Sequence, residues 1–493
     1  MGKQMTDYLL YRWRYVLGYG LIGLTVIGLL IVAGLFIPGG LSQAEMHSVV
    51  SSNASALSLD SFQPESVINL PYHLLQHASL SLFGVSNISI KLPSLLLGLF
   101  SVVGMFLLLR MWFRENVAVL TAVIVITTGQ FLFVAQSGTS SIVYLFWSVW
   151  LLVSAMMISR RAKHRILWKV VLFALAALSS YTPLSPYILI ALASAIILHP
   201  HLRYLVRRLS KAKLAIGIFV ALVLVAPLIY AIVREPSVLL TLFGIPTSQP
   251  DIIQNLLQLL RQYFDFVSPS SGMVMTPVYG LGSVILIVLG IIQLVTTKYT
   301  ARSYIITAWT ILLAPVLIIN PGYISITFVP VMLLIAMGIS MLLTNWYRLF
   351  PRNPYARFAG LLPLTILIGG LVFSGIGRYM YGYSYGPQTA GNFTHDLQML
   401  NTQLSDPTRG ATQLVTSKDE APFYSVVAKH TPNVTVTSEN NVPAPSVPAS
   451  IYKTIVVTHA AHTTNQSPQL YRIVTDSTSH DADRLYIYKT NLK

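Results

Sequence analysis

The sequence predicts an α-helical polytopic membrane protein with about eleven transmembrane helices, followed by a small extracytoplasmic α/β domain. Hydrophobic residues make up 54% of the 493 residues, and charged residues make up only 10%. Many of the apolar residues form runs of about 20 residues, the length of helix that crosses the hydrocarbon core of a bilayer. The polar composition of residues 385–493 indicates that the chain leaves the membrane there.

The apolar runs place the predicted spans along the chain by their length and hydropathy. The first run predicts an uncleaved anchor, because a signal peptide with a cleavage site at Ser42-Gln43-Ala44 would have a shorter apolar core. The predicted spans are 15–37, 92–112, 116–136, 141–158, 166–182, 184–199, 214–233, 277–297, 303–320, 323–345 and 358–379.

Basic residues predict the orientation of these spans. Most lysines and arginines fall on one side of the membrane if the spans alternate, with clusters at 160–165 and 203–213. Because basic loops favour the cytoplasm, we expect a cytoplasmic N-terminus in the inner (plasma) membrane and an extracytoplasmic C-terminal domain. The net charge of +16 then reflects membrane topology, and we expect no nucleic-acid partner. The basic residues on the other side of the membrane region are Lys91, Arg234, Arg261 and Arg378.

The predicted membrane domain covers residues 1–384, and the remaining residues form the predicted α/β domain. Within the membrane domain we expect outer loops at about 38–90 and 234–276. Apolar residues recur at helical spacing over 42–57 and 66–84 of the first loop. This pattern predicts two amphipathic helices that lie along the membrane surface and cover the bundle.

The C-terminal residues alternate between two kinds of pattern. The stretch VPAPSVPAS at 442–450 is predicted to be a turn-rich connector. Helix-like patterns occur at 393–404 and 421–430, and strand-like patterns occur at 413–417, 433–438, 454–460 and 484–490.

Short motifs after the first span resemble a known family. They read Leu70-Pro71-Tyr72, Phe83-Gly84 and Lys91-Leu92-Pro93-Ser94, and the stretches SSYTPLSPYILI and GYISITFVPVMLLIAMGI follow them. In this order, over residues 15–345, they resemble the GT-C class of polytopic membrane glycosyltransferases. This class includes protein O-mannosyltransferases, bacterial glycosyltransferase 39-type enzymes and aminoarabinose transferases. The resemblance implies a GT-C-like fold, a polyprenyl-phosphate sugar as donor substrate, and no tightly bound cofactor.

The resemblance also implies a reaction at the outer face of the membrane. An acceptor hydroxyl, on a lipid, a glycan or a protein, would attack the anomeric carbon of the lipid-linked sugar. Such a transfer needs a carboxylate that takes the proton of the acceptor and a cation that stabilises the departing phosphate. The family keeps an Asp-Glu pair just after its first span, and the matching residues here are Ala44 and Glu45. Glu45 is therefore the candidate general base, although the aspartate of the pair is missing.

Other residues are candidates for the same site, and each also has an ordinary explanation. Asp265 could replace the missing aspartate, and His47 could assist Glu45 or bind a metal. Basic residues near the membrane surface could bind phosphate oxygens, but they are also common as interfacial or snorkelling side chains. Because the His and acidic residues are scattered along the chain, we expect no tightly bound metal. The substrate-binding candidates are Lys91, Arg261, Arg234, Tyr72, His73 and His47.

Two further departures from the family leave other functions open. Gln136-Ser137-Gly138-Thr139 carries no charge where the family often has an Arg-Glu-Ala-Arg-like stretch, and Tyr181-Thr182-Pro183-Leu184 replaces a Tyr-Thr-His-Tyr motif. One alternative is a catalytically degenerate protein that binds lipid-linked glycan or assists assembly of the cell envelope. A second alternative is a transporter or flippase, but transport pathways usually need more charged residues within the spans than this chain has.

Overall fold

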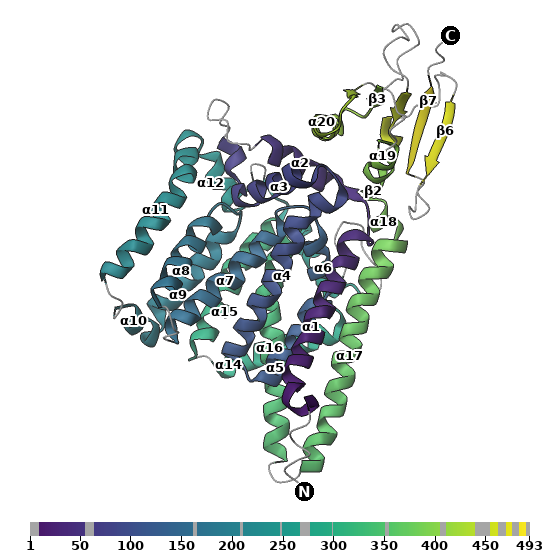
Figure 1. The fold of residues 1–493 in the computed structure, drawn as a ribbon. Coiled ribbons are helices and arrows are strands. Elements are labelled where there is room, and N and C mark those ends of the chain that lie inside the picture. Colours follow the sequence, from purple (N-terminus) through teal and green to yellow (C-terminus); the bar gives the residue numbers. More distant parts are fainter. Residues whose placement is uncertain are drawn as a thin grey trace.

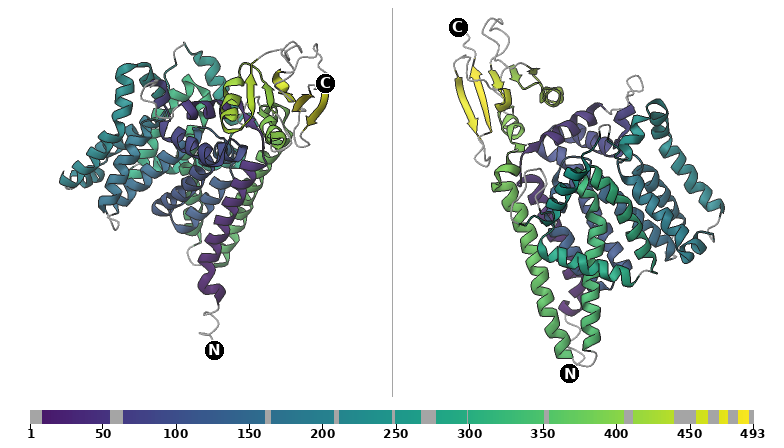
Figure 2. Two further views of the ribbon diagram at one scale, coloured as in Figure 1. Left: turned by 45° about the horizontal axis from the view of Figure 1, so that its top comes forward. Right: turned by 180° about the vertical axis from the view of Figure 1, so that it is seen from behind.

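The computed structural model is a bundle of helices with two surface helices and a small sheet domain at one end (Figure 1). Helices α2 (Gln43–Ala54) and α3 (Leu70–Phe83) lie across this end of the bundle. The C-terminal strands lie beyond the upper end of α17 (Pro354–Tyr385), as the two further views in Figure 2 also show. The residues that the structure describes are 9–54, 64–160, 165–207, 211–246, 249–266, 277–297, 299–350, 354–404, 411–438, 454–461, 470–475 and 483–489.

Among these residues, seven helices are long and apolar enough to cross a membrane, or up to nine spans if each of two bent pairs is one span. The chain is therefore an integral membrane protein of the predicted polytopic helical class. The other two predicted spans are shorter helices, because α8 ends at Ser179 before Pro183 and α14 begins only after the extended residue Gly280.

The remaining helices of the bundle are α1 (Leu9–Leu35), α4 (Asn87–Trp112), α5 (Glu115–Thr127), α6 (Gly129–Gln136), α7 (Ser141–Ser159), α8 (Arg165–Ser179), α9 (Ser185–Leu198), α10 (Pro200–Arg207), α11 (Lys211–Arg234), α12 (Ser237–Leu242), α13 (Ile252–Phe264), α14 (Leu281–Thr296), α15 (Ala301–Ile319) and α16 (Phe328–Leu349), with 3₁₀ turns at Pro64–Val67 and Pro321–Thr327.

Helix α16 is the most buried of the spans and packs tightly against α14. A Cβ on Gly290 of α14 would lie 2.1 Å from the Leu334 carbonyl oxygen, and one on Gly338 of α16 would lie 2.2 Å from that of Leu286. Only glycine allows two helix backbones to approach this closely, as in other membrane helix pairs. The glycines therefore fix α14 against the centre of the bundle.

A bend of 58° separates α5 from α6. The hydroxyl groups of Thr127 and Thr128 each donate a hydrogen bond to a carbonyl group one turn earlier, and Thr128 has an extended backbone. Gly375 of α17 packs against the break, where a Cβ would lie 2.2 Å from the Thr127 carbonyl oxygen. Beyond the bend, the segment after α6 lies against the start of α2. There the Gly138 backbone N–H donates a hydrogen bond to Glu45 of α2.

The C-terminal domain is a five-stranded mixed sheet with the order β4-β3-β5-β7-β6. Strand β3 is parallel to β4 and β5, whereas β7 is antiparallel to β5 and β6. The predicted connector at 442–450 lies outside the described residues. The elements of this domain are β2 (Phe393–Thr394), α19 (Asp396–Leu404), β3 (Thr412–Val415), α20 (Ala421–His430), β4 (Val434–Thr437), β5 (Thr454–Val457), β6 (Leu470–Thr475) and β7 (Arg484–Lys489), and they follow the short helix α18 (Pro387–Ala390).

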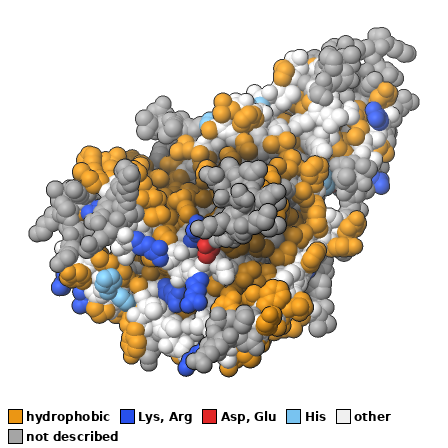
Figure 3. All heavy atoms as spheres, turned by 60° about the horizontal axis from the view of Figure 1, so that its bottom comes forward, with side chains coloured by type: hydrophobic (Ala, Val, Ile, Leu, Met, Phe, Trp, Pro, Cys, Tyr) orange, Lys and Arg blue, Asp and Glu red, His pale blue; other side chains and the backbone are white. Residues whose placement is uncertain are grey.

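Basic side chains gather at the end of the bundle opposite the C-terminal domain (Figure 3). This end includes the last turns of α4, α7 and α16 and the short helix α10 (Figure 1). Its assignment to the cytoplasm stays a prediction from the positive-inside rule. The exposed arginines on these elements and their adjoining loops are Arg110, Arg114, Arg160, Arg203, Arg207 and Arg348.

Candidate functional site

A capping box fixes the start of α2, just after the first span. The Ser42 hydroxyl oxygen accepts a hydrogen bond from the Glu45 backbone N–H at 3.3 Å. In return, Glu45 Oε2 accepts bonds from the Ser42 backbone N–H at 2.7 Å and from its hydroxyl at 3.0 Å. This reciprocal Ser-x-x-Glu pattern satisfies backbone groups at helix starts, where the helix dipole also favours negative charge. Glu45 therefore has a structural role in holding α2.

Lys91 forms an ion pair with Glu45 in the protein interior. The Lys91 Nζ atom lies 3.8 Å from Glu45 Oε1, and both side chains are 0% exposed. Lys91 also donates hydrogen bonds to the Gly40 carbonyl oxygen at 2.9 Å and to Gln136 Oε1 at 3.0 Å. The Glu45 Oε1 atom accepts a further bond from the Gly138 backbone N–H at 2.7 Å. The ammonium and both carboxylate oxygens are therefore engaged with protein groups and shielded from solvent.

The uncharged stretch 136–139 supplies part of this enclosure. Gly138 donates its backbone N–H to Glu45, and its carbonyl oxygen accepts a hydrogen bond from Gln76 Nε2 at 2.9 Å. A Cβ on Gly138 would lie 2.8 Å from a methyl carbon of Ile90, so the stretch passes too close to α4 for a larger residue. The Gln136 amide therefore supplies a hydrogen-bond acceptor to Lys91, and Gly138 allows the close approach that shields the Lys91–Glu45 ion pair from solvent.

The loop between α1 and α2 is also tied to α17 and to the C-terminal domain. The Tyr379 hydroxyl donates to the Ile37 carbonyl oxygen at 2.6 Å. His395 lies between the Asp483 carboxylate, 3.0 Å from Nδ1, and the Pro38 carbonyl oxygen, 3.2 Å from Nε2. Strand β1 (Leu41–Ser42) pairs with β2 in antiparallel fashion. The backbone that carries Glu45 is thus held from several sides.

Tyr72 and His73 of α3 are buried under the surface helices. The Tyr72 hydroxyl lies 2.8 Å from Ser94 Oγ, and His73 Nδ1 lies 2.8 Å from Ser52 Oγ. Burial raises the pKa of Tyr72, with a smaller contribution from the charge of Glu45, and burial lowers the pKa of His73 to about 4. Both rings are therefore neutral at pH 7, and they pack within the seam between α2, α3 and α4.

The other predicted residues lie apart from this ion pair. Arg234 is exposed at the end of α11, where its guanidinium lies 5.3 Å from the ring centroid of Tyr230. Arg261 is exposed on α13, and Asp265 follows the last residue of that helix. His47 is exposed and lines a shallow pocket between α2 and α20. In the described part of the chain, no three His, Asp or Glu side chains group closely enough to hold a metal ion.

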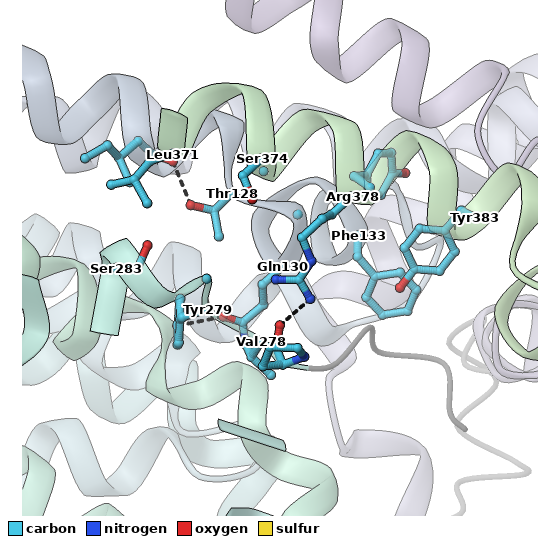
Figure 4. A pocket seen from close by; sticks show the side chains of 16 residues that line it. Thr128, Gln130, Phe133, Val278, Tyr279, Ser283, Leu371, Ser374, Arg378 and Tyr383 are labelled. Carbon is cyan, nitrogen blue, oxygen red and sulfur yellow. Dashed lines mark hydrogen bonds between the residues drawn. The ribbon is translucent and has the colours of Figure 1, made fainter. Parts of the chain in front are cut away.

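A separate cavity, partly open to solvent, lies between the α5–α6 break, the start of α14 and α17 (Figure 4). Arg378 of α17 points into it and donates a hydrogen bond from Nη2 to the Pro277 carbonyl oxygen at 2.6 Å. The rings of Phe133 and Tyr383 stack in its wall with centroids 5.2 Å apart. Tyr279 donates to Gln130 Oε1 at 2.7 Å across another wall. Its other lining residues are Ile124, Thr128, Gly129, Pro277, Val278, Gly280, Ser283, Leu371, Ser374, Gly375 and Tyr379.

Comparison with solved structures identifies the architecture. ArnT from Cupriavidus metallidurans in the apo state matches 96% of this chain and 98% of its own, with 15% identity and a TM-score of 0.51. The same protein bound to undecaprenyl phosphate matches with the same values. The oligosaccharyltransferase AglB from Archaeoglobus fulgidus, in complex with an inhibitory peptide and a dolichol-phosphate, matches 91% of this chain and 70% of its own, with 13% identity and a TM-score of 0.50. The chain has the GT-C fold.

The match to ArnT spans 96% of this chain, so it includes residues of the C-terminal domain as well as the membrane domain. Residues 71–230 also match the sequence model of the dolichyl-phosphate-mannose-protein mannosyltransferase family. No curated protein matches the chain by sequence. The predicted class of fold is therefore confirmed, whereas the roles of individual site residues stay predictions.

Within this GT-C fold, two features of the site were missed by sequence reasoning. The first is the capping role of Glu45, although the pattern Ser42-x-x-Glu45 is a known signal for a helix start. The second is Arg378, which sequence analysis treated only as one of the few basic residues on its side. The sequence does contain a signal for a functional role of Arg378, because it is the only charged residue in the span Phe358–Tyr385.

Proposed function

We propose that the protein is a membrane glycosyltransferase that moves a sugar from a polyprenyl-phosphate donor to an acceptor on the outer face of the membrane. The observation that carries this proposal is the match of nearly the whole chain to ArnT, a protein that has been solved with undecaprenyl phosphate bound. The family match over residues 71–230 supports the same chemistry. The acceptor would be a lipid, a glycan or a protein with a free hydroxyl or amino group.

In the proposed reaction, the acceptor oxygen or nitrogen forms a bond to the anomeric carbon as the bond from that carbon to the phosphate oxygen breaks. The polyprenyl phosphate leaves with the electron pair, and a carboxylate takes the proton of the acceptor. Glu45 can act as this base only if it leaves the groups that now surround it. Asp265, which is partly exposed at the end of α13, is the other candidate.

The test uses the purified protein in lipid nanodiscs with labelled polyprenyl-phosphate sugars and a panel of lipid, glycan and peptide acceptors. We expect labelled product from the wild type and its loss in either Glu45→Gln or Asp265→Asn. Glu65→Gln, which removes an exposed carboxylate on the same side of the bundle, serves as the matched control. The proposal is overturned if the wild type transfers no sugar from any donor.

The second candidate is a catalytically degenerate protein that binds lipid-linked glycan. Two observations favour it: Ala44 stands where the family keeps an aspartate, and Glu45 is enclosed within a buried ion pair. A wild-type protein that binds polyprenyl-phosphate sugars, yet releases no product with any acceptor, would support this candidate. Measured transfer by the wild type would exclude it.

A further inference from the structure

Arg378 is a cation within a membrane span, and none of the described acidic side chains forms an ion pair with it. Arg378 is the only charged residue in the span Phe358–Tyr385. No described acidic side chain forms an ion pair with it, although such pairs form at Lys91 and at Arg110. A charge within a membrane span is costly, so such residues usually serve a ligand, an ion pathway or a partner residue.

The geometry around Arg378 leaves room for a ligand. Its guanidinium donates one hydrogen bond, to the Pro277 carbonyl oxygen, and a guanidinium has five N–H donors. The side chain reaches from α17 toward the segment 277–279 across the cavity (Figure 4). Hydroxyl groups of Thr128, Ser283 and Ser374 lie on the same lining. This arrangement suits a planar, bidentate contact with the oxygens of a phosphate group.

The surroundings of the cavity favour a phosphate that carries an apolar tail. Phe373 of α17 is 81% exposed and Leu281 of α14 is 62% exposed, as expected for helices that face lipid. The wall near Arg378 is formed by aromatic rings, including Phe133 and Tyr383. A ligand with a charged head and a long hydrocarbon chain would therefore place its head at Arg378 and its chain along apolar protein or lipid.

We infer that Arg378 binds the phosphate of the polyprenyl-phosphate carrier in the cavity between the α5–α6 break, α14 and α17. This inference rests on the proposed function and names the residue that holds its lipid substrate. Lys91, the cation that the family resemblance favours, already contacts Gly40, Gln136 and Glu45. Arg378 keeps most of its donors available for a substrate.

One wall of the cavity is also joined to α13, the helix that precedes the second candidate base. The Val278 backbone N–H donates to the Gln262 carbonyl oxygen at 2.9 Å, and the rings of Tyr279 and Tyr263 stack with centroids 6.1 Å apart. These contacts join the last turn of α13 to the segment that accepts the hydrogen bond of Arg378. Asp265 is the residue that follows that turn, so the second candidate base is connected to this wall of the cavity through α13.

Direct binding measurements test the inference. The wild type in detergent is titrated with undecaprenyl phosphate, with undecaprenol, which lacks the phosphate, and with inorganic phosphate. We expect the wild type to bind undecaprenyl phosphate most tightly, and Arg378→Gln to weaken this binding at least about tenfold. Arg378→Lys should retain part of the affinity, because it keeps the charge but not the bidentate geometry. Arg207→Gln, which removes an exposed arginine at the opposite end, should bind as the wild type does.

The outcomes separate this inference from the proposed function. Equal affinity of the wild type and Arg378→Gln for undecaprenyl phosphate overturns the inference while transfer activity can still be present. Loss of binding in Arg378→Gln with no transfer by the wild type supports the inference and overturns glycosyl transfer. Equally tight binding of inorganic phosphate overturns the assignment to a lipid. If Arg378→Gln does not fold, Ser374→Leu narrows the cavity instead, and unchanged binding by that variant counts against the inference.

Discussion

The membrane domain holds two basic residues in contrasting environments, Lys91 and Arg378. Lys91 is fully buried, paired with Glu45 and hydrogen-bonded to two further groups. Arg378 lies partly exposed in a cavity, with one hydrogen bond to a backbone carbonyl oxygen. The comparison shows that Lys91, the cation that the family resemblance favours, is already engaged with protein groups, whereas Arg378 makes one hydrogen bond. We therefore expect the charge of Lys91 to stabilise the fold and the charge of Arg378 to serve a ligand.

The contrast has an energetic basis. Removing one partner of a buried ion pair leaves an uncompensated charge in a medium of low polarity, which typically costs about 3–5 kcal/mol. Removing a cation that has no carboxylate partner, such as Arg378, leaves no buried carboxylate without its counter-charge, so this cost does not arise. Stability measurements can therefore tell the two environments apart without knowledge of the substrate.

The largest effect is expected for Lys91→Met. This variant leaves the Glu45 carboxylate buried without its cation, so the free energy of unfolding should fall by about 3–5 kcal/mol. The double variant Glu45→Gln/Lys91→Met should recover much of this loss, because neither charge is then stranded. Unfolding by denaturant in mixed micelles is measured for the wild type, for the single variants Lys91→Met and Glu45→Gln, and for the double variant, which together form a double-mutant cycle.

Lys429→Met, at an exposed position in the last turn of α20, is the control and should unfold as the wild type does. The contrast between Lys91 and Arg378 would be contradicted if Lys91→Met kept the stability of the wild type and lost only sugar transfer. Lys91 would then act on substrate rather than on the fold.

A smaller effect is expected from the pH dependence of the buried seam around His73. Burial lowers the pKa of His73 to about 4, below its usual value of 6.5, so the unfolded state binds more protons between these values. The contribution of the neutral His73 ring to the free energy of unfolding is therefore complete above about pH 6.5. It is lost as the pH drops toward 4, which lowers the free energy of unfolding by up to about 3 kcal/mol. His73→Gln should lack this component when unfolding is measured at pH 7.5, 5.5 and 4.0.

The exposed His47 provides the comparison for this measurement. His47→Gln, which replaces an exposed histidine on the neighbouring helix α2, is the control variant and should keep the pH dependence that the wild type owes to His73. Parallel stability profiles for the wild type and His73→Gln would show that protonation of His73 does not destabilise the seam.

Much of the fold could be predicted from the sequence, because the signals are local and repeated. The lengths of apolar runs located the helices, and the spacing of apolar residues at 66–84 indicated the surface helix α3. Strand β6 was missed, since its alternation is weak and it forms one edge of the sheet. The bend at Thr128 was also missed, because it depends on close contact with Gly375, far along the chain.

The site was harder to predict for the same reason. Sequence position selected Glu45 and Lys91 as candidates, but their enclosure depends on Gln136 and Gly138, and Gln136 is already 45 residues beyond Lys91. No local pattern distinguishes a buried carboxylate from a solvated one. The cavity at Arg378 combines segments near residues 130, 279 and 378, and only the folded bundle brings them together.

The smallest effect on stability is expected for Arg378→Gln, which completes the comparison with Lys91→Met. The substitution removes a hydrogen bond to Pro277, a loss of about 1 kcal/mol, and also removes a costly unpaired charge, so the net change should be below about 1 kcal/mol. The same denaturant titration measures it beside Lys91→Met. A loss of several kcal/mol would show that Arg378 supports the fold as Lys91 does. An unchanged fold with at least tenfold weaker binding of undecaprenyl phosphate would place the two residues in separate roles, because binding would then depend on Arg378 while folding would not.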